Sequence, residues 1–174
     1  MKVEELKKCI RDIPNFPQEG ILFKDISTLL KDKEAFKESI DLLAKKYKKE
    51  KIEYVVGVES RGFIFGAPLA YVLGAGFVPV RKKGKLPYKT KSITYALEYG
   101  NDTLEIHEDA LRPNSRVLIV DDLLATGGTI KAVMDLLKGF KPKVVGVTFL
   151  VELKFLKGKS KLKNFPIHSI LQYD

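Results

Sequence analysis

The residues best suited to do chemistry lie in one run, residues 117–129, VLIVDDLLATGGT. The run begins as an apolar strand, and two adjacent carboxylates, Asp121 and Asp122, follow the strand. A glycine-containing turn then opens a helix, where converging N–H groups and about half a positive charge bind anions. The residues of that turn are Ala125, Thr126, Gly127, Gly128 and Thr129.

The two parts of this run suit different chemical groups. The glycines let the backbone approach a phosphate, whereas Asp121 and Asp122 are acceptors that suit hydroxyls or a hydrated cation. A ligand with a phosphate at one end and a diol at the other, such as ribose 5-phosphate, matches both parts. The alternative is an acidic turn before a capped helix. Other nucleotide sites are not indicated, because GxxxxGK[ST] is absent and no GxGxxG follows a strand.

Two further segments carry charge. Glu59-Ser60-Arg61-Gly62 follows the apolar run at 54–58, YVVGV, which predicts a strand. Parallel strands bring their carboxyl ends to one sheet edge, so we expect this segment beside Asp121. A surface ion pair is the alternative for Arg61. Residues 81–87, RKKGKLP, form a basic loop that is either solvated or matched to a phosphorylated ligand.

The elements that position these residues alternate along the chain. Apolar runs at 77–80 and 144–151 predict two more strands. Helical spacing of apolar residues predicts helices from Val3 to Ile13 before Pro14, at 36–47, at 62–73 and from Ile130 to Leu137. Alternating strands and helices indicate an α/β fold with a mostly parallel central sheet flanked by helices.

Residues 92–107 depart from this alternation. Apolar and polar residues alternate on both sides of Gly100-Asn101, which predicts a β-ribbon with a two-residue turn. In its first arm Glu98 lies on the face opposite Tyr95, from which it would point into a site beneath the ribbon. Together with the basic loop, this region, 81–108, is where we expect a flexible lid.

Length and composition limit the possible classes. With 174 residues, 45% hydrophobic and 30% charged, the sequence predicts a single domain, 1–174. The net charge of +9 fits a nucleic-acid binder, a cleft for polyanions or a lysine-coated surface, so charge alone does not decide. No apolar run approaches the ~20 residues of a membrane span, and the N-terminus lacks the pattern of a signal peptide. Because Cys9 is the single cysteine, we expect a cytoplasmic location.

The 117–129 run resembles the signature of the type I phosphoribosyltransferases. Further segments resemble the adenine-using members of that family, and they occur in the same order: Phe16-Pro17, 20–26, 59–63, 81–87 and 97–100. The resemblance extends from about Asp12 to Tyr173. It implies the type I phosphoribosyltransferase fold, with a small N-terminal hood at 1–33 and the ribbon lid at 81–108.

The same resemblance implies that adenine and 5-phosphoribosyl-1-pyrophosphate give AMP and pyrophosphate. The transition state would resemble an oxocarbenium ion, so catalysis would depend on positioning and on stabilising the leaving pyrophosphate. Mg²⁺ would be the cofactor, held by substrate and water near the paired aspartates rather than directly by the protein. The implied catalytic residues are Glu98, Arg61, Asp121 and Asp122. The implied residues that bind phosphoribosyl pyrophosphate and AMP are Glu59, Ser60, Arg61, Gly62, Arg81, Lys85, Asp121, Asp122, Ala125, Thr126, Gly127, Gly128 and Thr129.

The resemblance also assigns roles to loops and to a partner. In similar enzymes the 59–62 loop binds pyrophosphate through backbone N–H groups, often with a non-proline cis peptide. The segment with Arg81 and Lys85 can reach a neighbouring subunit's site, and a homodimer is implied. No nucleic acid or membrane is expected as a partner.

Base recognition is implied for Leu22, Phe23 and Lys24. Phe23 would stack on the purine, while the backbone of Leu22 and Lys24 would bond the 6-amino group and N1. A 6-oxopurine would leave these groups mispaired. Many similar enzymes have arginine where Lys24 stands, a change that a backbone contact survives. Glu98 would assist the loss of a proton near N7 as N9 attacks, and a solvent-facing glutamate is the alternative.

Two other functions stay open. A 6-oxopurine phosphoribosyltransferase would use guanine, hypoxanthine or xanthine with the same donor. A phosphoribosyl-pyrophosphate-sensing transcriptional regulator would need a DNA-binding segment, and none fits before Pro14 or after Val151. Cys9, His107, His168 and Met134 are interpreted as structural or incidental.

Overall fold

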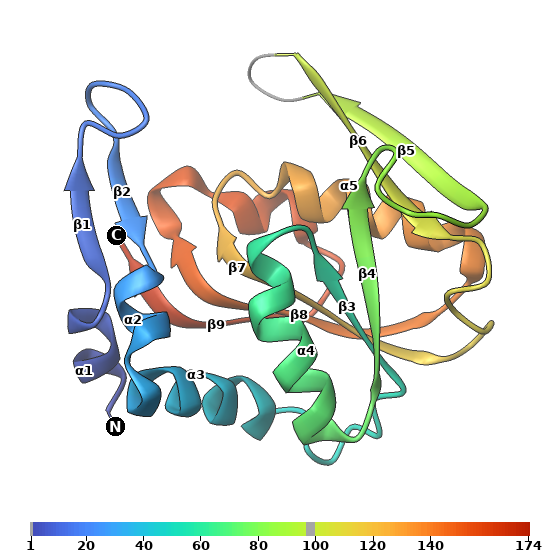
Figure 1. Ribbon diagram of the computed structural model, residues 1–174, viewed down its shortest axis with the longest axis horizontal. Helices are drawn as coiled ribbons and strands as arrows, with labels where there is room; N and C mark the ends of the chain where they lie inside the picture. Colours follow the sequence, from blue (N-terminus) through green and yellow to red (C-terminus); the bar gives the residue numbers. More distant parts are fainter. Residues whose placement is uncertain (1, 97–99) are drawn as a thin grey trace. The chain divides into compact units, whose positions relative to one another are not determined.

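The chain divides into two units, Met1–Leu42 and Leu43–Asp174 (Figure 1). The computed structural model describes residues 2–96 and 100–174. The smaller unit holds helices α1 (Val3–Lys8) and α2 (Ser27–Lys31), a two-stranded sheet of β1 (Arg11–Pro14) and β2 (Leu22–Asp25), and most of α3 (Lys33–Lys45). Within the described ranges, no helix has the length and apolar character needed to cross a bilayer.

The start of the chain differs from the predicted helix over Val3 to Ile13. The helix ends at Lys8, and Cys9 closes it by donating its backbone N–H to the Leu6 carbonyl at 3.0 Å. Ile13 instead lies in β1 opposite Phe23 of β2. Helical spacing therefore predicted the wrong element, because pairing with β2 supplies the backbone partners of this segment.

The larger unit is built on a seven-stranded sheet with the order β5-β6-β4-β3-β7-β8-β9. Its strands are β3 (Tyr54–Val58), β4 (Gly76–Lys82), β5 (Thr90–Ala96), β6 (Asn101–His107), β7 (Arg116–Leu124), β8 (Lys143–Leu153) and β9 (Ile167–Tyr173). The five strands from β4 to β9 in that order are parallel, while β6 runs antiparallel to both β4 and β5. The predicted mostly parallel sheet is confirmed.

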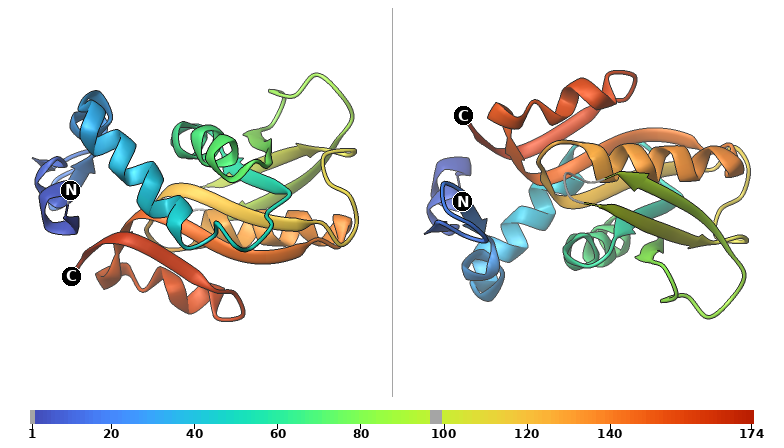
Figure 2. Two further views of the ribbon diagram at one scale, coloured as in Figure 1. Left: turned by 90° about the horizontal axis from the view of Figure 1, so that it is seen from below. Right: turned by 90° about the horizontal axis from the view of Figure 1, so that it is seen from above.

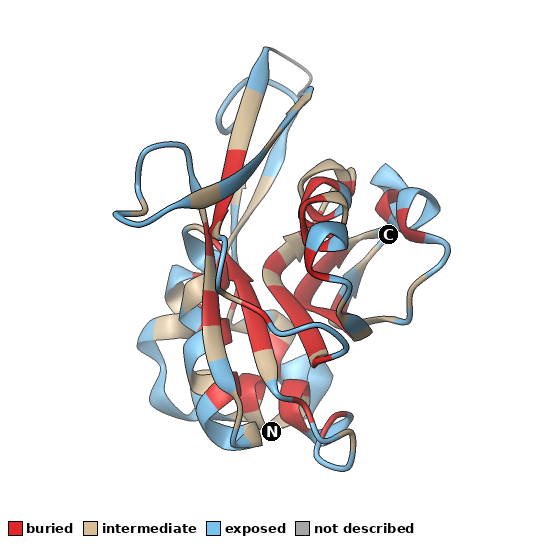
Figure 3. Ribbon diagram, turned by 90° about the vertical axis from the view of Figure 1, so that its right-hand side faces the viewer, coloured by how far each residue is buried: buried red, intermediate tan, exposed pale blue. Residues whose placement is uncertain are grey.

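Helices cover both faces of this sheet. Helix α4 (Arg61–Leu73) lies on one face and α5 (Gly128–Leu137) on the other, as the views along the sheet show (Figure 2). The apolar face predicted for α5 is buried, with Ile130, Val133 and Leu137 each 2% exposed or less. Buried residues concentrate along the central strands and α5, whereas the outer part of the β5–β6 ribbon is exposed or intermediate (Figure 3).

The ribbon forms, but its predicted two-residue turn is wrong. Ala96 pairs with Asn101, so Asn101 belongs to strand β6 and is not a turn residue. The centre of the strand pairing therefore lies nearer the N-terminus than the predicted turn at Gly100-Asn101. Cross-strand contacts explain this register: the Thr94 and Thr103 hydroxyls lie 2.8 Å apart, and Ile93 lies opposite Leu104.

The C-terminal part adds elements that the sequence did not predict. After α5 comes a short 3₁₀ helix, η1 (Lys138–Phe140). Two more, η2 (Lys154–Leu156) and η3 (Gly158–Leu162), follow β8 and lead into β9. Because β9 pairs in parallel with β8, it forms the sheet edge beyond the strand that was expected to end the core.

Candidate functional site

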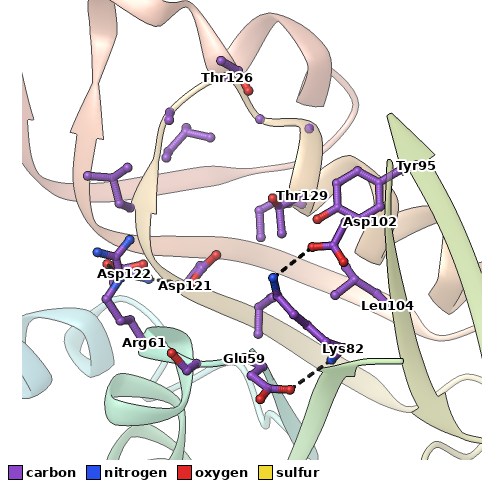
Figure 4. A pocket seen from close by; sticks show the side chains of 18 residues that line it. Glu59, Arg61, Lys82, Tyr95, Asp102, Leu104, Asp121, Asp122, Thr126 and Thr129 are labelled. Atoms are coloured by element: carbon purple, nitrogen blue, oxygen red, sulfur yellow. Dashed lines mark hydrogen bonds and ion pairs between the residues drawn. The ribbon is translucent and has the colours of Figure 1, made fainter. Parts of the chain in front are cut away.

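A cavity of about 440 Å³ opens at the carboxyl ends of β3 and β7 in the larger unit (Figure 4). Its walls are the segment after β3, the end of β7 with the following turn, and residues of β4, β5 and β6. The lining residues are Val58, Glu59, Ser60, Arg61, Lys82, Tyr95, Asp102, Leu104, Asp121, Asp122, Leu123, Leu124, Ala125, Thr126, Gly127, Gly128, Thr129 and Ile130. The two charged segments predicted to share a sheet edge therefore face one cavity.

Strand pairing explains this juxtaposition. Gly57 of β3 lies beside Val120 of β7, so the next residues of both strands emerge together. Gly62 allows the first turn of α4 to approach β7 closely, because a Cβ at Gly62 would lie 2.9 Å from an Asp121 carboxylate oxygen. The sheet thus places the start of α4 against the paired aspartates.

The two aspartates carry the main electrostatic feature of the cavity. The Arg61 guanidinium Nε lies 2.8 Å from Asp122 Oδ2, and the Asp122 backbone N–H donates to Asp121 Oδ1 at 2.9 Å. Burial, reinforced by the neighbouring Asp122 charge, raises the pKa of Asp121 well above its usual range. Burial also raises the pKa of Asp122, although Arg61 opposes that shift. The pair is therefore costly to ionise, and a cation or hydroxyl donors in the cavity would favour its charged form.

The turn after β7 forms the opposite wall. Gly127 has φ of +79°, a left-handed conformation that favours glycine, and it immediately precedes α5. Its carbonyl accepts the Lys131 backbone N–H at 3.0 Å, which starts the helical hydrogen bonding. Because α5 is anchored by its buried face, its N-terminus points a fixed set of N–H groups at the cavity beside Thr126 and Thr129.

Glu59 connects the cavity to the basic loop. Arg81 donates from Nε and Nη2 to the two Glu59 carboxylate oxygens, each at 3.2 Å, and the Lys82 backbone N–H donates to Glu59 at 3.0 Å. Burial raises the pKa of Glu59, but these hydrogen bonds outweigh it and lower the pKa overall. Arg81 also donates from Nη1 to the Lys85 carbonyl at 3.1 Å. The Glu59–Ser60 peptide bond is cis, as the resemblance implied for this loop.

The β5–β6 ribbon and the end of β4 complete the wall. Lys82 Nζ lies 3.2 Å from Asp102 Oδ2, and both side chains face the cavity with Tyr95 (Figure 4). Tyr95 pairs with Asp102 across the ribbon. The face of β5 toward the cavity is thus that of Tyr95.

Comparison with known proteins identifies the family. The phosphoribosyl transferase domain family matches residues 25–165. The adenine phosphoribosyltransferase of Clostridium tetani is 56% identical over 170 residues, which cover 98% of this chain and 99% of that protein. The chain belongs to the adenine phosphoribosyltransferases. These enzymes are pentosyltransferases of purine salvage.

Solved structures of adenine phosphoribosyltransferases share the fold. The enzyme of Thermoanaerobacter pseudethanolicus is 53% identical, with a TM-score of 0.95 over 99% of this chain and 100% of that chain. The Saccharomyces cerevisiae enzyme, solved with D-2,5-dideoxy-2,5-imino-altritol 1,6-bisphosphate and adenine, is 45% identical. Its TM-score is 0.91, over 97% of this chain and 98% of that chain. The α/β fold expected from the resemblance to phosphoribosyltransferases is confirmed.

The predicted phosphoribosyltransferase residues divide into four groups by position. Most of the residues expected to bind the donor line the cavity: Glu59, Ser60, Arg61, Asp121, Asp122, Ala125, Thr126, Gly127, Gly128 and Thr129. Gly62 packs behind Asp121, while Arg81 at the end of β4 and Lys85 in the loop after it are not among the lining residues. Leu22, Phe23 and Lys24 belong to β2 of the smaller unit, and Glu98 lies outside the described residues.

The cavity also contains residues that sequence reasoning did not assign to the site. Lys82, Tyr95, Asp102 and Leu104 line it, although only the neighbouring Arg81 and Lys85 were chosen from the basic loop. The correct ribbon register would have placed Tyr95 opposite Asp102 and so on one face with it. No signal in a single sequence separates Lys82 from its neighbour Lys83.

Proposed function

We propose that the chain transfers the phosphoribosyl group of 5-phosphoribosyl-1-pyrophosphate to adenine. A bond forms between adenine N9 and ribose C1, the bond from C1 to the pyrophosphate oxygen breaks, and N9 loses a proton. The products are AMP and pyrophosphate. The observation that carries the proposal is the position of Asp121 and Asp122 between the starts of α4 and α5 in one cavity.

The 5-phosphate of the donor would occupy the turn before α5. Its anionic charge is matched by the N–H groups at the start of the helix and by the Thr126 and Thr129 hydroxyls. Gly127 and Gly128 present backbone rather than side chain to that position. The turn therefore serves to hold one end of the donor while C1 reacts.

The ribose diol and Mg²⁺ would occupy the region of Asp121 and Asp122. The donor set fits, because carboxylate oxygens facing an open cavity suit a hydrated, oxygen-liganded ion. The raised pKa values of the pair support the same view, since a cation would offset the cost of their charges. When bound, Mg²⁺ would neutralise charge that develops on the departing pyrophosphate. The carboxylates orient hydroxyls and water, and neither acts as a nucleophile.

The leaving pyrophosphate would meet Ser60 and Arg61. Backbone N–H groups at the start of α4 and the Arg61 guanidinium supply positive potential where negative charge builds during bond breaking. Lys82 adds an ammonium at the same cavity, and Arg81 at the end of β4 and Lys85 in the following loop contribute further charge nearby. Catalysis is thus proposed to rest on positioning and on stabilising this group.

The adenine ring would be recognised by Leu22, Phe23 and Lys24. Lys24 Nζ is bound to Asp12 Oδ1 at 2.6 Å, so the Lys24 side chain is held in an ion pair, and the contact with the base is proposed for the Lys24 backbone. Phe23 packs edge-on against Phe16 with ring centroids 5.1 Å apart. A ring fixed in this way is suited to stacking on a purine.

A homodimer in the cytoplasm is proposed as the working form. The α4 helix carries a row of exposed apolar side chains at helical spacing, Ile64, Tyr71 and Val72, and Tyr71 is 88% exposed. A second copy would cover this apolar surface. Sedimentation of the purified chain at micromolar concentration checks the proposal, which a monomer would contradict.

Substrate competition tests the proposed reaction. With phosphoribosyl pyrophosphate and Mg²⁺ fixed, initial rates are compared for adenine, hypoxanthine, guanine and orotate. Adenine is expected to exceed the others by about 10³-fold or more, because a 6-oxo group would leave polar groups mispaired. Preference for hypoxanthine would support the 6-oxopurine alternative. Salt-dependent binding to duplex DNA without any transferase activity would support a regulator.

A further inference from the structure

The 3₁₀ helix η3 touches the phosphate-binding turn directly, backbone against backbone. A Cβ built on Gly158 would lie well within 3.0 Å of the Ala125 carbonyl oxygen, and 3.0 Å from a Leu124 methyl carbon. In the other direction, a Cβ on Gly127 would lie 2.5 Å from the Gly158 carbonyl oxygen. Both positions therefore exclude a side chain, and the two segments hold each other at a fixed distance.

η3 is anchored to the sheet rather than to the turn that it contacts. Leu162, at its end, is 2% exposed and belongs to the hydrophobic core. Lys159 Nζ lies 2.7 Å from Glu152 Oε2 in β8, and the Ser169 hydroxyl in β9 donates to the same oxygen. The Glu152 side chain is 5% exposed and that of Lys159 is 44% exposed, so the carboxylate of this ion pair is covered while the ammonium remains partly in solvent.

We propose that residues 157–162, the brace segment, fix the position of the phosphate-binding turn, and that Gly158 is a positioning residue for the 5-phosphate end of the donor. The proposal rests on the proposed function, in which this turn binds the 5-phosphate. A turn between a strand and a helix can shift outward, and a displacement of about 1 Å can cost ~10²-fold in rate. The brace segment blocks that shift from outside the cavity.

The other end of the cavity provides an internal control. Ser60 and Arg61, proposed to bind pyrophosphate, belong to the start of α4 on the opposite face of the sheet from α5 (Figure 2). Displacing the turn should therefore lower the affinity for ligands that carry a 5-phosphate and leave the affinity for pyrophosphate unchanged. A general loss of stability would weaken both.

The test is the Gly158→Ala variant of the full chain, titrated with ribose 5-phosphate and with pyrophosphate in the presence of Mg²⁺. We expect ribose 5-phosphate affinity to fall about tenfold or more and pyrophosphate affinity to change by less than about twofold. The KM for phosphoribosyl pyrophosphate should rise more than the KM for adenine. Gly139→Ala in η1 is the matched control, because a Cβ there would meet only the flexible end of Lys91, at 3.4 Å.

A second variant, Lys159→Met, loosens the anchor without adding volume at the turn and tests the proposal if Gly158→Ala does not fold. This variant should lower the affinity for ribose 5-phosphate by about threefold and leave the affinity for pyrophosphate unchanged. An equal loss of affinity for ribose 5-phosphate and for pyrophosphate, or no change in either affinity, would contradict the proposed role of the brace segment. If the wild-type chain bound no ribose 5-phosphate and formed no AMP, the proposed function would be contradicted. The proposed role of the brace segment, which rests on that function, would then be contradicted as well.

Discussion

The guanidinium of Arg61 lies 2.8 Å from the Asp122 carboxylate and joins the first residue of α4 to the end of β7. The two side chains differ in exposure: that of Arg61 is 45% exposed and that of Asp122 is 6% exposed. Both residues line the cavity, and the guanidinium is the more accessible of the two groups. An anionic leaving group can therefore contact the Arg61 guanidinium while Arg61 keeps its ion pair with Asp122.

Replacing Arg61 with Met should keep the aliphatic packing of the side chain and remove its charge. We expect kcat/KM for phosphoribosyl pyrophosphate to fall about 10²-fold, roughly 3 kcal/mol, because charge on the departing pyrophosphate loses a donor. Steady-state kinetics with varied donor measure the effect. Arg112→Met is the control, since Arg112 is exposed and pairs with Glu53 at 3.0 Å. Equal losses in both variants would contradict the assigned role.

The Asp121→Asn variant should be more stable and less active than the wild type. Because the folded-state pKa of Asp121 is raised, the folded chain binds more protons than the unfolded chain above pH 3.8, and stability falls as pH rises through this window. The amide removes the buried charge and can still accept the Asp122 N–H. We expect about 1 kcal/mol of added stability at pH 8 and at least about a tenfold loss of kcat/KM. Thermal unfolding and kinetics at pH 8 measure both, and a destabilised variant would show that the charge is not costly.

Lys82 and Lys83 are adjacent but should differ in function. Both side chains are exposed, but Lys82 lines the cavity and pairs with Asp102, whereas Lys83 is not among the lining residues. Lys82→Met is expected to raise the KM for phosphoribosyl pyrophosphate about tenfold. Lys83→Met, which removes the same charge from the chain, should change it by less than about twofold. Similar KM values for the two variants would indicate that only overall charge matters.

The proton-transfer role implied for Glu98 by family resemblance predicts a specific kinetic pattern. Glu98→Ala should lower kcat by about 10²-fold while changing the KM for adenine much less, and should remove the acidic limb of the pH–rate profile. Glu108→Ala, an exposed carboxylate after β6, serves as control. A kcat equal to that of the wild type would assign Glu98 to the solvent face.

His168 should make the chain less stable in mild acid. Burial, together with the positive charges of Lys46 and Lys159, lowers the pKa of His168 below its usual 6.5. As pH falls below 6.5 the unfolded chain takes up this proton first, so stability decreases until the folded-state pKa is reached and then levels off. His168→Gln should flatten this part of the curve and can still bond Thr148. Urea unfolding of both proteins between pH 5 and 8 measures the difference.

The sequence predicted the central βαβ units well because their signals are local. The buried runs at β3, β7 and β8 are too apolar for any other place in a soluble fold, and α5 shows an uninterrupted helical face. The position of the 59–62 segment beside Asp121 followed from sheet geometry alone, because Gly57 and Val120 are paired just before both segments. That is why the sequence could predict that these two segments share one edge of the sheet.

Non-local pairing set the limits of prediction. Ile13 has helical spacing but belongs to a hairpin, because its partner is Phe23, ten residues further on. The ribbon register depended on matching Ile93 with Leu104 rather than on the Gly100 turn signal. The contact of Gly158 with Ala125 joins segments with no shared pattern, and only the folded chain reveals it.

The side-by-side placement of Gly57 and Val120 has an evolutionary consequence. One residue inserted into β7 would turn every following side chain to the other face of the sheet and move the aspartates by about 3.3 Å along the strand. One residue inserted into the connection before Arg116 would be absorbed by the loop. Surviving length variants of this chain should therefore cluster in the connections and be absent from the strands that end at the cavity.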